Sequence, residues 1–260
     1  MPDRRRHRGR HPADQALFAP ERLPALHEAL DDLCWLLGRG YSDKAAIALV
    51  GDRYQLRTRQ RIAIRRCACS DSARSARLAR KRDLDAVRDR ELAIDGFNCV
   101  VTLEAAISGG LVLVGRDHAH RDLASVHGSY RQVAETQAAL AAIAAALDRA
   151  RPRQVRWYLD RPVSNSGRLA ALIRELGHTA AQPWLVELVD NPDRALVARP
   201  EATVASSDAW VLDQAEAWLD LPGEIIARGL TNAGDAAGSS AEDKAGPAPT
   251  ANPWVVDLSR

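Results

Sequence analysis

The chain has 260 residues, of which 46% are hydrophobic, and a formal net charge of +2 at pH 7. This apolar content is enough for one large packed domain or two small ones. No apolar run approaches the ~18 residues that span a membrane, and no apolar segment follows the basic N-terminus, so we expect a cytoplasmic protein without an anchor or a signal peptide.

Charge is distributed unevenly along the chain. Residues 1–90 carry 21 Lys and Arg against 12 Asp and Glu, whereas residues 91–260 carry 15 against 22. Arg-rich helices that are simply solvated would explain the basic part taken alone. A basic part joined to an acidic part instead favours a polyanion that is held by the first and whose phosphates are presented to the carboxylates of the second.

The first ninety residues predict a basic tail followed by a small helical domain. Residues 1–20 are rich in Arg, His and Pro and are expected to be disordered. In residues 21–90, leucines recur at helical spacing, and Ser42 is a typical N-cap. Residues 56–67 form a basic amphipathic segment. We expect its arginines to hold the substrate backbone by charge: Arg57, Arg59, Arg61, Arg65 and Arg66.

After residue 91, short apolar strands alternate with helical segments. The predicted strands cover residues 92–95, 111–115, 154–160, 184–190 and 202–208. Segments with helical periodicity lie between the strands, as in "FNCVVTLEAAISG" and "SNSGRLAALIRELG". This alternation predicts an α/β domain over residues 91–228, with a mostly parallel sheet and helices on both faces.

The last part of the chain has the composition of a linker. Residues 229–253 are rich in Ala, Gly, Ser, Pro and acids, which predicts a flexible C-terminal tail over residues 229–260. The final "NPWVVDLSR" regains hydrophobicity. It either belongs to this tail or returns to the fold as an edge strand.

Aspartates stand at the ends of the predicted strands. Asp95, Asp160 and Asp208 each end a strand, and a fourth strand runs into "VDNPDRAL", which contains Asp190 and Asp193. Each acid alone is typical of a turn or of a helix N-terminus. In an open parallel sheet, however, the carboxyl ends of the strands line the active site. Clustered carboxylates with oxygen donors only would bind Mg²⁺ or Mn²⁺.

The loop that follows the predicted strand at residues 154–160 is a candidate anion site. It opens a helix with Ser164, Asn165, Ser166 and Gly167, and such a turn presents free backbone N–H groups to an anion. Ordinary N-capping by a serine explains the same residues equally well. The nearby Asp160 favours the binding of a substrate phosphate.

Cysteine and histidine patterns do not indicate a transition-metal site. The four cysteines lack CxxC spacing, so free thiols in a reducing compartment are expected. In "GRDHAHRD", His118 and His120 lie beside Asp117 and Asp122. An exposed, charged loop is favoured there, because two histidines on one strand face still need a third ligand.

Several short motifs occur together in a recognisable order. They are "IDGFN" at 94–98, "RDL" at 121–123, "WYLDRP" at 157–162, "NPDRAL" at 191–196 and "VASSDAWVLDQA" at 204–215. In this order they resemble PIN-like and NYN nuclease domains, which carry their Arg-Asp pair on a helix. The chain from about residue 22 to 220, including "RGYSDKAAIALVGDRYQL", also resembles the domain-of-unknown-function 434 family.

The PIN-like resemblance implies a Rossmann-like α/β/α sandwich and metal-dependent cleavage of phosphodiester bonds, usually in RNA. Asp95, Asp160, Asp193 and Asp208 fall on the acidic positions of the motif, and Asn98 falls on the polar one. Asp122 matches the helix acid. Three other acids compete with Asp122 for the second ligand position: Glu104, Asp117 and Glu135.

These features predict a metal-dependent nuclease, with RNA as the expected substrate. Asp95, Asp193 and Asp208 would hold a metal that activates a water, and Asp160 or a second metal would orient the attack. Asn98 would direct a carboxylate or a water. Two alternatives remain: a non-catalytic nucleic-acid or nucleotide-binding protein of the same fold, and a phosphatase or phosphotransferase for a small substrate.

Overall fold

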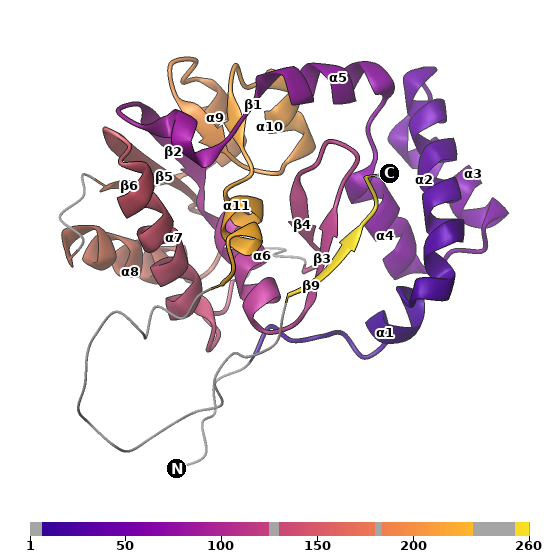
Figure 1. Cartoon of the computed structure of the whole chain (residues 1–260), viewed down its shortest axis with the longest axis horizontal. Coiled ribbons are helices and arrows are strands. Elements are labelled where there is room, and N and C mark those ends of the chain that lie inside the picture. Colours follow the sequence, from indigo (N-terminus) through magenta and orange to yellow (C-terminus); the bar gives the residue numbers. More distant parts are fainter. Residues whose placement is uncertain (1–6, 125–129, 180–183, 231–252, 260) are drawn as a thin grey trace, which may run out of the picture.

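A six-stranded sheet forms the α/β part of the molecule, which lies opposite the N-terminal helices in Figure 1. The computed structural model describes residues 7–124, 130–179, 184–230 and 253–259. All strands of this sheet run parallel. In spatial order they are β1 (Lys81–Arg82), β8 (Trp218–Leu219), β7 (Thr203–Ala205), β2 (Glu91–Asp95), β5 (Gln154–Asp160) and β6 (Trp184–Val189).

Helices cover both faces of this sheet. One face carries α6 (Gly96–Ile107), α7 (Thr136–Ala150), α8 (Ser166–Thr179) and α11 (Leu221–Ala227). The other face carries α9 (Pro192–Val197) and α10 (Ala209–Gln214). The predicted α/β/α sandwich with a parallel sheet is therefore confirmed.

Alternation along the strands assigns each side chain to one layer. In β2, Leu92 and Ile94 pack into the core under α6 and α7, whereas Ala93 packs against α9 and α10. In β5, Trp157 belongs to the first core and Tyr158 to the second. Because successive side chains of a strand point to opposite faces, Asp95 and Asp160 belong to the face of α9 and α10.

A second, three-stranded sheet lies beside the sandwich (Figure 1). It contains β4 (His120–Asp122), β3 (Leu111–Val114) and β9 (Trp254–Asp257), with β3 antiparallel to β4 and parallel to β9. The predicted strand at 111–115 is therefore real but does not join the main sheet. The C-terminal "WVVD" forms an edge strand, which is one of its two predicted alternatives.

The helical region completes its core with this second sheet. It contains α2 (Leu23–Gly38), α3 (Asp43–Arg53), α4 (Thr58–Cys67) and α5 (Asp71–Arg80), with two 3₁₀ turns, η1 (Pro20–Arg22) and η2 (Leu84–Val87). Leu30 and Ile64 pack in one cluster with Leu113, Val256 and Leu258. The helices thus share a core with residues from the end of the chain. No helix among the described residues is long and apolar enough to cross a membrane.

Part of the predicted basic tail is structured. Asp14–Leu17 form the short helix α1. Arg8 Nη2 lies 2.7 Å from Oε2 of the fully buried Glu104, and His7 Nδ1 lies 2.6 Å from Glu135 Oε1. The expectation of disorder fails for this stretch because acids far along the chain supply partners for its cations. Residues 1–6 lie outside the described residues.

Candidate functional site

Asp95 ends β2 and caps the next helix. Its Oδ1 accepts the N–H of Asn98 at 3.3 Å, and its Oδ2 accepts the hydroxyl of Ser206 at 3.0 Å. Only 8% of the residue is exposed. A buried carboxylate in this position satisfies a helix N-terminus while it faces the layer of α9 and α10.

The loop after β7 is locked onto the same helix terminus. Asn98 Oδ1 accepts both the N–H and the hydroxyl of Ser207 at 3.0 Å. The N–H of Asp208 donates to Ser206 Oγ at 3.1 Å, and Arg121 Nε donates to the carbonyl of Ser207 at 2.9 Å. The motifs "DGFN" and "SSD" are therefore one structural unit. No sequence pattern predicts these roles of Ser206, Ser207 and Arg121, although two serines before an acid are visible in the motif.

Gly96 permits the close approach of α6 to β5. A Cβ at this position would lie 2.5 Å from Leu159 Cδ2 and 3.1 Å from the carbonyl oxygen of Tyr158. We expect Gly96→Ala to lower the free energy of unfolding by about 1–3 kcal/mol, because the backbone of β5 cannot yield. Gly167→Ala is the control, since its Cβ would meet nothing within 4 Å. Equal denaturation midpoints for the two variants would contradict this explanation.

Three further carboxylates lie at the same edge of the sheet. Asp160 is the last residue of β5, the strand on which Tyr158 pairs with Asp95. Asp193 lies in the first turn of α9, which packs against β2 and β5. Asp208 caps α10 by accepting the N–H groups of Trp210 and Val211 on Oδ1. All three side chains are half-buried.

Electrostatics connect the four carboxylates. Burial, followed by the charges of Asp193 and Asp208, raises the pKa of Asp95 to about 7, although its two hydrogen bonds oppose this shift. Burial and the charges of Asp208 and Asp160 raise the pKa of Asp193 to about 6. Burial also raises the pKa of Asp160. The charges of neighbouring carboxylates thus oppose the ionisation of Asp95 and of Asp193.

These carboxylates lack ion-pair partners among the described residues. None of the four forms an ion pair with a described Lys, Arg or His. Among the described residues, no three His, Cys, Asp or Glu side chains are grouped closely enough to hold a metal ion. Mg²⁺, however, keeps several waters and needs only one or two protein carboxylates together with substrate phosphates. The donor set, four carboxylates of which two have pKa values near neutrality, therefore fits such a cation.

The competing acids lie elsewhere and have partners. Asp122 accepts the hydroxyl of Thr102 at 3.0 Å and the N–H of Ala124 at 2.7 Å. It lies on β4 and not on a helix, so the Arg-Asp pair departs from the PIN-like pattern. Glu104, Glu135 and Asp117 pair with Arg8, His7 and two arginines, respectively. Each of these acids stabilises the fold locally.

Most of the "GRDHAHRD" segment is buried or half-buried, which contradicts the expected exposed loop except at His118, which is exposed. Asp117 binds the guanidinium of Arg121 through two contacts of 2.7 Å and that of Arg77 through one of 2.7 Å. Arg77 also pairs with Asp213. These arginines hold the pKa of Asp117 well below its usual range. His120 Nδ1 lies 2.7 Å from Asp220 Oδ2.

The basic helix α4 does not adjoin the carboxylates. Figure 1 shows α4 beside α2 and α3 at one end of the molecule, while β5 and β6 lie toward the other end. Three of its arginines pair with aspartates of the helical region: Arg59 with Asp14, Arg61 with Asp52 and Arg65 with Asp43. Arg57 is exposed and Arg66 is half-buried. The expected grip on a substrate at the site is not supported by this placement.

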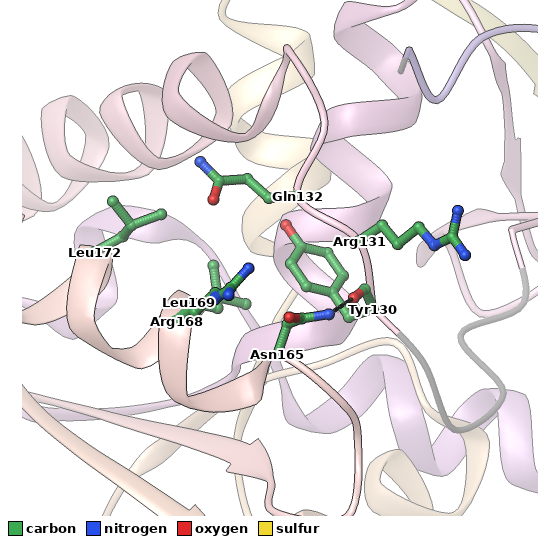
Figure 2. Close-up of a pocket in the computed structure, with 7 residues that line it drawn as sticks. All are labelled: Tyr130, Arg131, Gln132, Asn165, Arg168, Leu169 and Leu172. Carbon is green, nitrogen blue, oxygen red and sulfur yellow. Dashed lines mark hydrogen bonds between the residues drawn. The ribbon is translucent and has the colours of Figure 1, made fainter. Parts of the chain in front are cut away.

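The turn that was expected to bind an anion is hydrogen-bonded to the neighbouring loop that contains Tyr130. Asn165 has a φ of +66° and donates from Nδ2 to the carbonyl of Tyr130 at 2.8 Å, and the N–H of Tyr130 donates to the carbonyl of Ser164 at 3.3 Å. Figure 2 shows Asn165 and Tyr130 joined in this way at a pocket of about 210 Å³. Ser166 is buried and Gly167 is exposed. The turn therefore has a structural explanation that needs no phosphate.

Two family models and one curated relative match the chain. A domain of unknown function, DUF5616, matches residues 84–224, and a protein family of unknown function, DUF434, matches residues 25–80. The chain is similar to the uncharacterized protein MJ0935 of Methanocaldococcus jannaschii, with 29% identity over 204 residues, which cover 78% of this chain and 97% of that protein. No solved structure matches the chain.

Proposed function

The chain belongs to the family of the domain of unknown function DUF5616, and we propose that it is a metal-dependent nuclease that acts on RNA. The observation that carries this proposal is the set of four carboxylates at the carboxyl edge of the parallel sheet. Asp95 and Asp193 have raised pKa values, and no described cation pairs with any of the four. Such an arrangement is unfavourable unless a positive charge joins it.

Each residue of the site would have a separate role in RNA cleavage. A divalent cation bound by one or two of the carboxylates Asp193, Asp208 and Asp95, together with substrate phosphate oxygens, would lower the pKa of a water and stabilise charge at phosphorus. Burial and the charges of Asp193 and Asp208 raise the pKa of Asp95 to about 7 without a cation, and a bound cation would keep this carboxylate ionised. Ser206 and Asn98 hold the two loops in register. The half-buried Asp160 would orient the attack.

The carboxylate on α9 provides the test of this function. With Mn²⁺ or Mg²⁺ and labelled single-stranded RNA, we expect Asp193→Asn to slow cleavage by at least ~100-fold, because it removes a ligand and its charge. Asp190→Asn is the matched control on the same connection. Asp190 is exposed and pairs with Arg161 at 3.2 Å, so its loss should leave the rate within about threefold.

Each of the other outcomes identifies a different function. Absence of metal-dependent cleavage in the wild type, with RNA still bound, would favour a binding protein of this fold. Hydrolysis of a small phosphomonoester without RNA cleavage would favour a phosphatase. Cleavage that persists in Asp193→Asn would overturn the assignment of the site. We further propose a cytoplasmic location, because all four cysteines are unpaired, as expected in a reducing compartment.

A further inference from the structure

An exposed tryptophan lies beside the carboxylates. Trp210 is 47% exposed, whereas Trp157 and Trp218 are fully buried and Trp184 nearly so. Its backbone N–H donates to Asp208 Oδ1 at 2.9 Å, which places it within one helical turn of the site. A large aromatic side chain in contact with water loses the free energy that burial would provide. This position therefore calls for an explanation outside the core.

Hydrogen bonds from α5 hold α10, the helix that carries Trp210. Arg77 Nη2 donates to the carbonyl of Ala209 at 3.1 Å, and Arg80 Nη2 donates to the carbonyl of Leu212 at 3.1 Å. Val211 and Leu212 are fully buried beneath it. Because α10 is anchored on this side, Trp210 is held outward on a rigid support and loses little further freedom when it binds a partner.

Cationic side chains accompany this aromatic surface. α9 packs against α10 and carries the exposed Arg194, and Arg161, which pairs with the exposed Asp190, is itself exposed where β5 ends. Neutral aromatic faces interspersed with arginines are the combination by which proteins bind single-stranded nucleic acids. The carboxylates, the aromatic ring and the arginines lie along one edge of the sheet.

We propose that Trp210 stacks on an unpaired base and thereby selects single-stranded RNA for the neighbouring carboxylates. This inference rests on the proposed nuclease function and deepens it by naming the substrate class. Bases in a duplex are already stacked on their neighbours, so only an unpaired base can offer its face to the indole ring. The ring would place the adjacent phosphodiester over Asp208 and Asp193.

Binding without cleavage tests the stacking directly. The Kd of a fluorescein-labelled 12-nucleotide RNA is measured in EDTA for the wild type, Trp210→Ala, Trp210→Phe and Trp35→Ala. We expect Trp210→Ala to raise the Kd by ~5- to 150-fold, the range for loss of one base stack, and Trp210→Phe to retain most of the affinity. Trp35→Ala removes a tryptophan that is 57% exposed on α2 and should leave the Kd unchanged.

An abasic RNA separates stacking from general contact. If one nucleotide stacks on the ring, an oligonucleotide without that base should bind wild type and Trp210→Ala equally weakly. A duplex of the same sequence should bind more weakly than the single strand and should not respond to Trp210→Ala. Unchanged unfolding midpoints confirm that the variants are folded.

The results distinguish this inference from the nuclease proposal. Equal affinity of wild type and Trp210→Ala, equal losses in Trp35→Ala and Trp210→Ala, duplex binding as tight as single-strand binding, or no RNA binding at all would overturn the stacking. Trp210-dependent binding without cleavage in Mn²⁺ or Mg²⁺ would contradict the nuclease but leave the single-stranded ligand in place.

Discussion

Asp95→Asn is expected to slow metal-dependent RNA cleavage by at least ~100-fold and at the same time to stabilise the protein. Asparagine has the same shape as aspartate. Its Oδ1 can accept the N–H of Asn98, and its Nδ2 can donate to Ser206 Oγ, so both contacts of Asp95 survive. What disappears is a buried negative charge beside two others. We expect the free energy of unfolding at pH 8 in EDTA to rise by about 2–4 kcal/mol.

The sign of this effect depends on pH. The folded-state pKa of Asp95, about 7, is above the ordinary value of 3.8. The native wild type therefore binds this proton more tightly than the unfolded chain and loses stability as pH rises from about 4 through 7. The variant has no such loss. Its advantage should be absent below about pH 4 and complete above about pH 7.

A second buried aspartate gives a control of opposite sign. Asp117 faces two guanidinium groups, and its pKa lies well below the usual range. Asp117→Asn should therefore destabilise the protein at pH 8, where Asp95→Asn stabilises it. Urea unfolding of both variants from pH 4 to 8 measures the difference. A loss of stability in Asp95→Asn at pH 8 would contradict the view that its charge is uncompensated.

Arg121→Ala is expected to lower the free energy of unfolding by about 3–5 kcal/mol. Arg121 is 2% exposed, binds Asp117 through two contacts and donates to the carbonyl of Ser207. Its removal leaves a buried carboxylate with half of its partners and frees the loop that holds Asp208. Removing one partner of a buried pair costs more than the pair itself contributes.

An exposed arginine provides the comparison for Arg121. Arg65 pairs with Asp43 at 2.5 Å, but both side chains are accessible to water. Arg65→Ala should cost no more than ~1 kcal/mol. The double variant Arg121→Ala, Asp117→Ala should lose less free energy of unfolding than the two single variants lose together, because it also removes the buried carboxylate that Arg121→Ala leaves without half of its partners. Equal midpoints for Arg121→Ala and Arg65→Ala would show that burial does not decide these energies.

Local patterns predict the elements of the sandwich because their causes are local. The apolar runs before Asp95 and Asp160 are strands because each alternates between two covered faces. The strand at 111–114 is equally visible in the sequence, but its sheet is not. Its side chains pack against α2 and α4 on one side and α6 on the other, and no periodicity encodes such a choice of partner.

Long-range ion pairs explain why local charge patterns predict the surroundings of charged residues poorly. The charges of Asp117 and Arg121 predict a solvated loop, yet Arg77 and Asp213 come from distant segments and complete their burial. The basic pattern of α4 predicts contact with a substrate, but aspartates outside the segment are the partners of its arginines. At the site, the charge of Asp193 does raise the pKa of Asp95, whereas the hydrogen bonds of Asp95 with Ser206 and of Asn98 with Ser207 depend on tertiary contacts.

The position of β9 has a consequence for the order of folding during synthesis. The core of the helical region contains Val256 and Leu258, which the ribosome adds long after Ile64. At typical elongation rates, the helices wait on the order of 10 to 40 s for these last apolar side chains. During that interval Leu30 and Leu113 lack part of their cover. In a nascent chain, the helices α2 and α4 therefore stay exposed to aggregation and to chaperones until Val256 and Leu258 have been added.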